Sequence, residues 1–245
     1  LFRSFTTQGR IDLPDIVKKS KNQKIIWQIF LFGDKNWILK QIRKAEANNC
    51  LAISICLDAP NRSYRYSDRE NRYDARKYGN WNMAKSPNPE MALNYDFKII
   101  EWIKSKTKLP IIPKGIMHVD DSKKLLDLGA DAIWLSNHGG RMVNSGISVL
   151  EILRDHKNKI NKNIFYIVDG GVRKGSDVFK YIISGADLVA IGRPALYGLM
   201  ANGSNGVENV FSIFKEEMDI FLKNSGIKSI EYLKKNRELY QRDKN

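Results

Sequence analysis

The stretch LPIIPKGIMHVDDSKKLLDLGADAIWLS, residues 109–136, contains the repeating unit that decides the fold. An apolar run of strand length at 109–114 is followed by a polar, amphipathic segment at 120–128 and a second apolar run at 131–136. Asp120 stands where a helix N-cap belongs, and Gly129 stands where a helix ends. This strand–helix–strand order predicts a parallel βαβ unit.

The same alternation extends in both directions along the chain. Apolar runs predict further strands at 24–30, 51–57, 164–169 and 187–192, with residues 1–7 as a candidate seventh strand. Amphipathic segments predict helices at 12–20, 34–48, 95–106, 147–158, 174–184, 205–224 and 229–241. Asp12 stands at an N-cap position and Gly185 at a helix end. The regular spacing favours one α/β domain over residues 1–245, a TIM (β/α)8 barrel whose first βα unit is absent from this chain.

Composition narrows the class of protein before any motif is considered. The 245 residues contain 41 Lys and Arg against 27 Asp and Glu, a net charge of +14 with neutral histidine. The balance of apolar and charged residues excludes a disordered, collagen-like or disulfide-scaffold chain. No apolar run approaches the roughly 20 residues of a membrane helix.

The positive charge raises the question of a nucleic-acid or anionic membrane partner. The lysines are spread along polar helical segments instead of forming a compact stripe of arginine and aromatic residues. We therefore expect a solvated basic surface and no nucleic acid as partner. A basic nucleic-acid-binding domain is kept as a rival, and it predicts an affinity that depends on salt.

The two cysteines bear on the compartment. Cys50 and Cys56 bracket one predicted strand, which would hold them about 20 Å apart, beyond disulfide reach. Reduced thiols predict a cytoplasmic location, either free or peripheral to a membrane.

Polar residues follow most of the predicted strands, where packing alone would not require them. In a parallel barrel the C-terminal ends of the strands share one face, so residues remote in sequence converge there. Taken singly each signal is weak, because an Asp after a strand is often a cap and a Gly-Gly pair a tight turn. Lys114 is the most informative, since a buried ammonium is costly unless an anion meets it.

Four segments in order and spacing carry a family resemblance: Lys114-Gly115, SNHGGR at 136–141, DGGVR at 169–173 and GRP at 192–194. They resemble the FMN-dependent 2-hydroxy acid dehydrogenases and oxidases, which include glycolate oxidase, lactate oxidase, flavin lactate dehydrogenase and mandelate dehydrogenase. The resemblance runs from about Ile11 to Tyr232, and it implies that an N-terminal part of such an enzyme is absent here.

This resemblance implies FMN as cofactor and the oxidation of an (S)-2-hydroxy acid to a 2-oxo acid. It leaves O2, a quinone or a cytochrome open as the electron acceptor, and it suggests a homo-oligomer such as a tetramer. No metal site is predicted.

The resemblance also assigns residue roles. His138 is the expected catalytic base, and Asp58 would orient it and stabilise its imidazolium. Arg141 would bind the substrate carboxylate, and Arg65 resembles the family's second arginine near the substrate. Lys114 would lie at the edge of the flavin ring that becomes negative on reduction. The full set expected to bind the cofactor is Gln28, Cys56, Lys114, Ser136, Asp169, Gly170, Gly171, Arg173, Gly192 and Arg193.

Within that set the expected roles differ. Gln28 would bond the isoalloxazine ring, with an outward-facing side chain as the alternative. Asp169 would contact the ribityl hydroxyls. The backbone of Gly170, Gly171 and Gly192, with Arg173 and Arg193, would bind the phosphate.

Three residues depart from the family pattern. Phe30, placed to contact the substrate, replaces a usual tyrosine; Cys56 replaces a threonine, and Asn144 replaces an aspartate. Phe30 and the short chain motivate an alternative, a non-catalytic or impaired relative that binds FMN or a protein partner. The segment 61–89 is too long for an ordinary βα loop and is predicted to be a lid-like insertion.

Overall fold

The computed structural model describes residues 2–7, 9–20, 24–59, 66–73, 95–143, 146–160 and 163–240. The chain divides into two compact units, Leu1–Ile133 with Arg141–Asn144, and Trp134–Gly140 with Ser145–Asn245. Within the described residues no helix combines the length and the apolar character of a membrane span.

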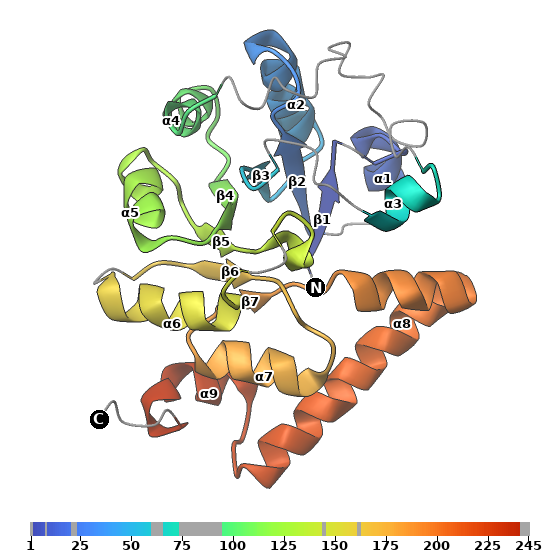
Figure 1. Ribbon diagram of the computed structural model, residues 1–245, viewed down its shortest axis with the longest axis vertical. Helices are drawn as coiled ribbons and strands as arrows, with labels where there is room; N and C mark the ends of the chain where they lie inside the picture. The colour runs from blue at the N-terminus through green and yellow to red at the C-terminus, as the bar shows by residue number, and fades with distance from the viewer. Residues whose placement is uncertain are drawn as a thin grey trace. The chain divides into compact units, whose positions relative to one another are not determined.

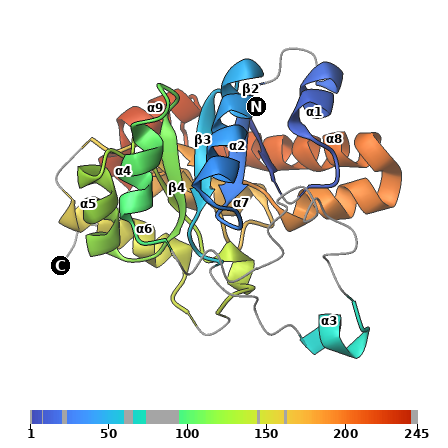
Figure 2. The ribbon, with the colours of Figure 1, turned by 90° about the horizontal axis from the view of Figure 1, so that it is seen from above.

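The first unit is built on four parallel strands that pair in chain order. Its elements are β1 (Phe2–Thr6), α1 (Leu13–Lys19), β2 (Lys24–Phe30), α2 (Lys35–Ala47), β3 (Ala52–Cys56), α3 (Tyr66–Glu70), α4 (Lys98–Lys104), β4 (Ile111–Ile116) and α5 (Val119–Asp127). β1 pairs with β2, β2 with β3 and β3 with β4, all parallel. Helices α2 and α4 lie against these strands (Figure 2).

The central strands β2 and β3 are buried on both faces, as expected of a parallel sheet covered by helices. Every residue of β3 is buried, and in β2 only Lys24 is exposed. One face packs large apolar side chains such as Trp27, Ile29 and Ile55, each at most 1% exposed. The opposite face carries the polar residues of the candidate site.

The second unit continues the alternation of strands and helices. Its elements are β5 (Ile133–Leu135, beginning at the unit boundary), a 3-10 turn (His138–Gly140), α6 (Val149–Lys159), β6 (Tyr166–Val168), α7 (Gly175–Ile183), β7 (Leu188–Val189), α8 (Arg193–Asn224), α9 (Ile230–Lys235) and a 3-10 turn (Arg237–Tyr240). β6 pairs with β7 in parallel, and the N–H of Asp169 donates to the carbonyl of Leu135. The α/β fold of the barrel class is therefore confirmed, whereas the expectation of one domain stays a prediction.

In each unit an aspartate side chain caps the N-terminal end of a strand. Asp131, just before β5, accepts a hydrogen bond from the N–H of Ile111 at 2.7 Å and forms an ion pair with Lys104. Asp187, just before β7, accepts from the N–H of Tyr166 at 2.8 Å and pairs with Arg237. Each carboxylate thus satisfies the N-terminal N–H of the preceding strand.

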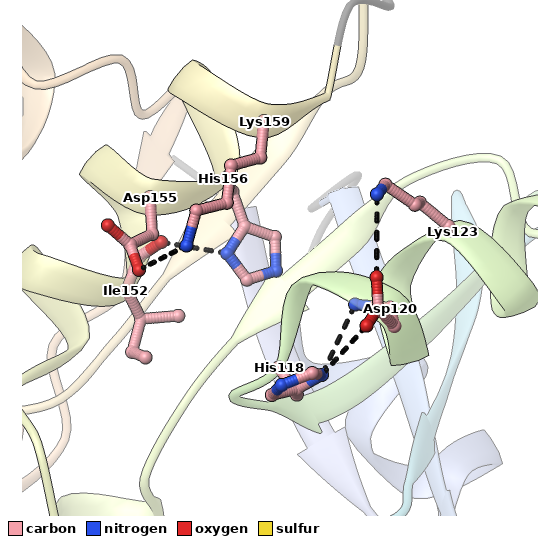
Figure 3. Close-up of polar contacts among 7 residues, drawn as sticks. All are labelled: His118, Asp120, Lys123, Ile152, Asp155, His156 and Lys159. Carbon is pink, nitrogen blue, oxygen red and sulfur yellow. Dashed lines mark hydrogen bonds and ion pairs between the residues drawn. The ribbon is translucent and has the colours of Figure 1, made fainter.

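Most local start and stop signals are confirmed. Asp12 caps α1, and Gly129 and Gly185 follow the ends of α5 and α7 with φ of 94° and 116°. The prediction that Asp120 caps its helix is wrong. α5 begins at Val119, and the side chain of His118 accepts from the N–H of Asp120 at 3.3 Å (Figure 3). A histidine ring nitrogen therefore takes the role that we expected of a carboxylate.

The helix predicted at 205–224 begins earlier, at Arg193. α8 changes direction at Asn202 and Gly203, which have non-helical dihedral angles (Figure 1). The two segments meet where Gly198 packs against Gly206, because a Cβ on either glycine would collide with the backbone of the other. Glycine has a low helix propensity, which is why the pattern predicts that this helix begins only at residue 205. The close packing of Gly198 against Gly206 stabilises the helix in spite of that propensity.

Candidate functional site

Two rows of side chains lie on one face of the sheet in the first unit. Residues in register on parallel strands point to the same side, as do residues two apart on one strand. The lower row is Thr6, Gln28, Ser54 and Ile112, and the upper row, nearer the C-terminal ends of the strands, is Phe30, Cys56 and Lys114. The structure therefore brings together Gln28, Phe30, Cys56 and Lys114, as the sequence predicts.

Two polar side chains are buried on this face. Lys114 is 7% exposed and Gln28 is 9% exposed, each within an otherwise apolar strand. A buried cation is stabilised only where negative charge or hydrogen-bond acceptors meet it. Gln28 is buried on the same face as Lys114, and its bond to the isoalloxazine ring stays a prediction.

Asp58 lies at the C-terminal end of β3, beside this face. Its Oδ1 lies 2.9 Å from the sulfur of Cys56. Gly115 of β4 lies against its side chain, because a Cβ added there would come within 2.7 Å of Oδ2. The N–H of Leu57 donates to the carbonyl of Lys114 at 2.9 Å, which attaches the loop to β4.

Phe30, in the same row as Cys56 and Lys114, belongs to a small apolar cluster. Its ring stacks on Phe32 with 5.5 Å between centroids and 6° between planes, and both rings pack with Cys56 and Ala59. This wall offers no hydroxyl at position 30 to a substrate.

In the second unit, Asp169 is the acceptor of a polar network at the ends of β5 and β6. Its Oδ1 accepts from Ser136 Oγ at 2.6 Å and its Oδ2 from Trp134 Nε1 at 3.0 Å. Ser136 Oγ in turn accepts the N–H of His138 at 3.1 Å. The structure thus connects three of the predicted site residues through one carboxylate.

His138 is held in an unusual backbone conformation. Its φ is 53°, and the next two residues, Gly139 and Gly140, have φ of 67° and 73°. A non-glycine residue in the left-handed region is costly and persists only where its surroundings hold it, which is common at functional sites. The His-Gly-Gly sequence supplies the two residues that follow it in the same region at little cost.

Asn137, to which the sequence analysis assigned no role, holds this turn. Its Oδ1 accepts the N–H of Gly139 at 3.1 Å, and its carbonyl accepts the N–H of Gly140 at 2.9 Å. A Cβ at Gly170 would come within 2.7 Å of Asn137 Oδ1, so that glycine makes room for the amide. An Asn beside a turn glycine is the signal that could have identified it.

Arg193 supports the same turn from the start of α8. Its Nη2 donates to the carbonyl of Gly139 at 2.7 Å. This contact occupies one of the five N–H donors of the guanidinium. A second residue without a predicted role, Tyr181 of α7, donates its hydroxyl to the carbonyl of Gly170 at 2.8 Å.

Two of the three predicted phosphate-binding glycines, Gly171 and Gly192, border open space. A Cβ added to Gly171 or Gly192 would meet no atom of the described residues within 4 Å. Gly192 is the N-cap of α8 and has no side chain to cap the helix, so the positive end of the helix dipole is open to an anion. Arg173 is exposed nearby in sequence and donates to the carbonyl of Val172 at 2.9 Å.

The residues present fit FMN in both units. The first offers a buried lysine and a buried amide beside an apolar wall, suited to a flavin ring. The second offers a carboxylate for polyol hydroxyls and two open glycines at a helix N-terminus, suited to a phosphate.

Several predicted site residues are not brought together by these observations. Asp58 belongs to the first unit and His138 to the second, so their pairing stays a prediction. Arg141 belongs to the first unit and is exposed. Arg65 and Asn144 lie outside the described residues, as does most of the predicted lid at 61–89, of which 66–73 are described and contain α3.

Comparison with known proteins identifies the class. A model of the FMN-dependent dehydrogenase family matches residues 4–240, and the chain therefore belongs to that family. The chain is 34% identical over 240 residues to L-lactate oxidase of Lentilactobacillus hilgardii, covering 94% of this chain and 65% of that protein. It is 31% identical over 234 residues to a peroxisomal (S)-2-hydroxyacid oxidase of Arabidopsis thaliana, covering 90% of this chain and 64% of that protein.

A solved structure agrees with the family assignment. The crystal structure of a lactate oxidase of Pediococcus acidilactici matches with a TM-score of 0.89 at 34% identity, over 96% of this chain and 66% of that chain. The chain thus spans just under two thirds of the length of the curated relatives that it matches. The resemblance inferred from the four sequence motifs and the expected cofactor class, FMN, are confirmed.

Proposed function

We propose that this chain contributes to the FMN-dependent oxidation of an (S)-2-hydroxy acid to a 2-oxo acid. The carrying observation is the His138 turn, in which a potential base stands at a φ of 53° on a hydrogen-bonded support. Such a strained and fully supported position is expected for a residue whose orientation matters to chemistry. The family and the names of the relatives support the reaction class.

The roles of the chain's residues follow from their chemistry. His138 takes a proton from the substrate on a ring nitrogen, and Asp58 stabilises the imidazolium that results. Arg141 and Arg65 bind the substrate carboxylate, for which a planar guanidinium offers paired hydrogen bonds. Phe30 and Phe32 supply an apolar wall for the substrate side chain.

The cofactor-binding roles divide between the two units. Lys114 and Gln28 hold the flavin ring, with Cys56 next to Lys114 in the same row. Ser136 and Asp169 bind the ribityl chain, and Gly170, Gly171, Arg173, Gly192 and Arg193 bind the phosphate. When bound, FMN accepts the two electrons that the α-carbon of the hydroxy acid loses. Lys114 would supply positive charge to the flavin ring that it holds.

An anaerobic spectral titration of the full-length protein tests this function. The flavin absorbance should bleach with at least one of L-lactate, glycolate or (S)-mandelate. A His138→Ala variant should retain FMN and lose the bleaching, because the base is gone and the phosphate site is intact. Normal bleaching in that variant would refute the role of His138.

The alternative is a relative that binds FMN without oxidising hydroxy acids. Phe30 favours it, since this residue packs on Phe32 and offers no hydroxyl to a substrate. Retained flavin that no hydroxy acid bleaches would establish this alternative. The acceptor, the oligomeric state, the basic surface without a nucleic-acid partner and the cytoplasmic location stay predictions.

A further inference from the structure

The thiol of Cys56 lies against the carboxylate of Asp58. Cys56 is the last residue of β3, and Asp58 follows two positions later in the loop. The Cys56 sulfur lies 2.9 Å from Asp58 Oδ1, and the side chain of Cys56 is 5% exposed. The contact is therefore a buried one between a sulfur and a carboxylate oxygen, both at the C-terminal edge of the strand.

The thiol is the donor in this contact. Burial raises the pKa of the Cys56 thiol well above its ordinary value, the negative charge of Asp58 raises it further, and the positive charge of Lys114 opposes this. At neutral pH the sulfur therefore keeps its proton and donates a hydrogen bond, which Asp58 Oδ1 accepts.

A second neighbour restrains the same carboxylate from another side. A Cβ at Gly115 would come within 2.7 Å of Asp58 Oδ2 and would collide with the Asp58 side chain. The two oxygens of Asp58 therefore have different surroundings. Oδ1 accepts from the thiol of Cys56, and Oδ2 lies near the space that a Cβ at Gly115 would fill.

We propose that Cys56 is a positioning residue, whose thiol donates to Oδ1 and fixes the orientation of the Asp58 carboxylate. This inference rests on the function proposed above. It adds to the cofactor-binding role expected of Cys56 a contact to the carboxylate of Asp58, which the structure shows.

Infrared spectroscopy of the S–H stretching band tests the hydrogen bond without using enzyme activity. A thiol that donates to a carboxylate vibrates at a lower frequency than one that does not. Cys50 is the matched control, because it is the only other cysteine, it is buried, and its pKa is raised to about 11 by burial alone.

We expect two S–H bands, of which the lower-frequency band disappears in Cys56→Ser and moves to higher frequency in Asp58→Asn. The Cys50 band should stay unchanged in both variants. A Cys56 band that does not respond to Asp58→Asn would overturn the proposal.

Two substitutions then test the positioning role. Cys56→Val keeps the bulk of the side chain and removes the donor, whereas Cys56→Ser keeps a donor. With FMN content and KM close to those of the wild type, kcat should fall about tenfold or more in Cys56→Val and stay within about threefold in Cys56→Ser. Undiminished kcat in Cys56→Val would overturn the positioning role.

The two readouts separate this inference from the function on which it rests. A wild-type protein that oxidises no hydroxy acid overturns the proposed function and the positioning role together. The response of the infrared band to Asp58→Asn still supports the thiol–carboxylate bond in that case.

Discussion

Gly115 and Asp58 occupy adjoining space, so that no side chain fits at position 115. A Cβ there would lie 2.7 Å from Asp58 Oδ2 and closer still to the Cβ and Cγ of Asp58. Gly115 also has a φ of 97°, which side chains rarely adopt. The glycine after Lys114 is therefore required by the carboxylate of the neighbouring strand end as well as by its own backbone.

Gly115→Ala should lower the free energy of unfolding by about 2–4 kcal/mol, because a strained backbone and an overpacked contact combine. It should also lower kcat at least about tenfold, since Asp58 must move. Gly226→Ala is the control: its φ is 66° and a Cβ there meets no described atom within 4 Å, so backbone strain of about 1 kcal/mol is the only cost. Denaturant unfolding measures the free energy of unfolding, and steady-state kinetics measure kcat. Equal losses of stability in Gly115→Ala and Gly226→Ala would contradict a collision with Asp58.

Asp169→Asn should destabilise the protein by about 2–3 kcal/mol and weaken FMN binding. Trp134 and Ser136 each donate to a different oxygen of the carboxylate, and the indole N–H of Trp134 can only donate. The amide of Asn has a single oxygen, so it accepts from one of the two donors and turns its NH2 toward the other. Urea unfolding and FMN titration measure the two effects.

Asp155→Asn provides the matched control for that substitution. Asp155 pairs with Lys159 on the surface of α6 at 3.2 Å, with both side chains about half exposed (Figure 3). Its loss should cost no more than about 0.5 kcal/mol. A comparable effect of the two Asn substitutions would contradict the role of the Asp169 network.

His138→Gly should be more stable than His138→Ala by about 1 kcal/mol, because glycine adopts a φ of 53° without the clash of a Cβ. Both variants lack the base, so both should lose hydroxy acid turnover while FMN remains bound. Thermal and denaturant unfolding of the two variants give the difference. Equal stability would show that the left-handed backbone at this position carries no strain.

Tyr181 should make stability fall at alkaline pH. Burial, with the charges of Asp169 and Asp177, raises the pKa of the Tyr181 phenol from 10.0 to about 12. The unfolded chain then loses this proton first, so the stabilisation is present below pH 10 and is lost as pH rises toward 12, by up to about 2–3 kcal/mol.

The measurement is urea unfolding of the wild type and of Tyr181→Phe between pH 8 and pH 12. At pH 8 the free energy of unfolding of the variant should be about 1 kcal/mol below that of the wild type, because the hydrogen bond to the Gly170 carbonyl is lost. Its alkaline loss should be smaller than that of the wild type. Parallel curves across the whole range would exclude a contribution from Tyr181.

The pattern of residue types along the chain predicts the order of the strands and of every described α-helix except α3, with most of their bounds to within a few residues. Alternating apolar runs and helical patterns are local signals, and so are the Asp12 cap and the glycines at 129 and 185. The four motifs identified the family and the residues of each strand end, because their spacing repeats the unit of the fold.

Only the tertiary structure decided which residues meet within each unit. Register between parallel strands places Cys56 beside Lys114, and the loop after β3 brings Asp58 against Gly115. The roles of Asn137, Trp134 and Tyr181, the early start of α8 and the His118 cap also depend on it. All of these features escape prediction from the sequence for one physical reason. Hydrogen bonds and close packing depend on three-dimensional positions, which a pattern of residue types along one chain does not specify.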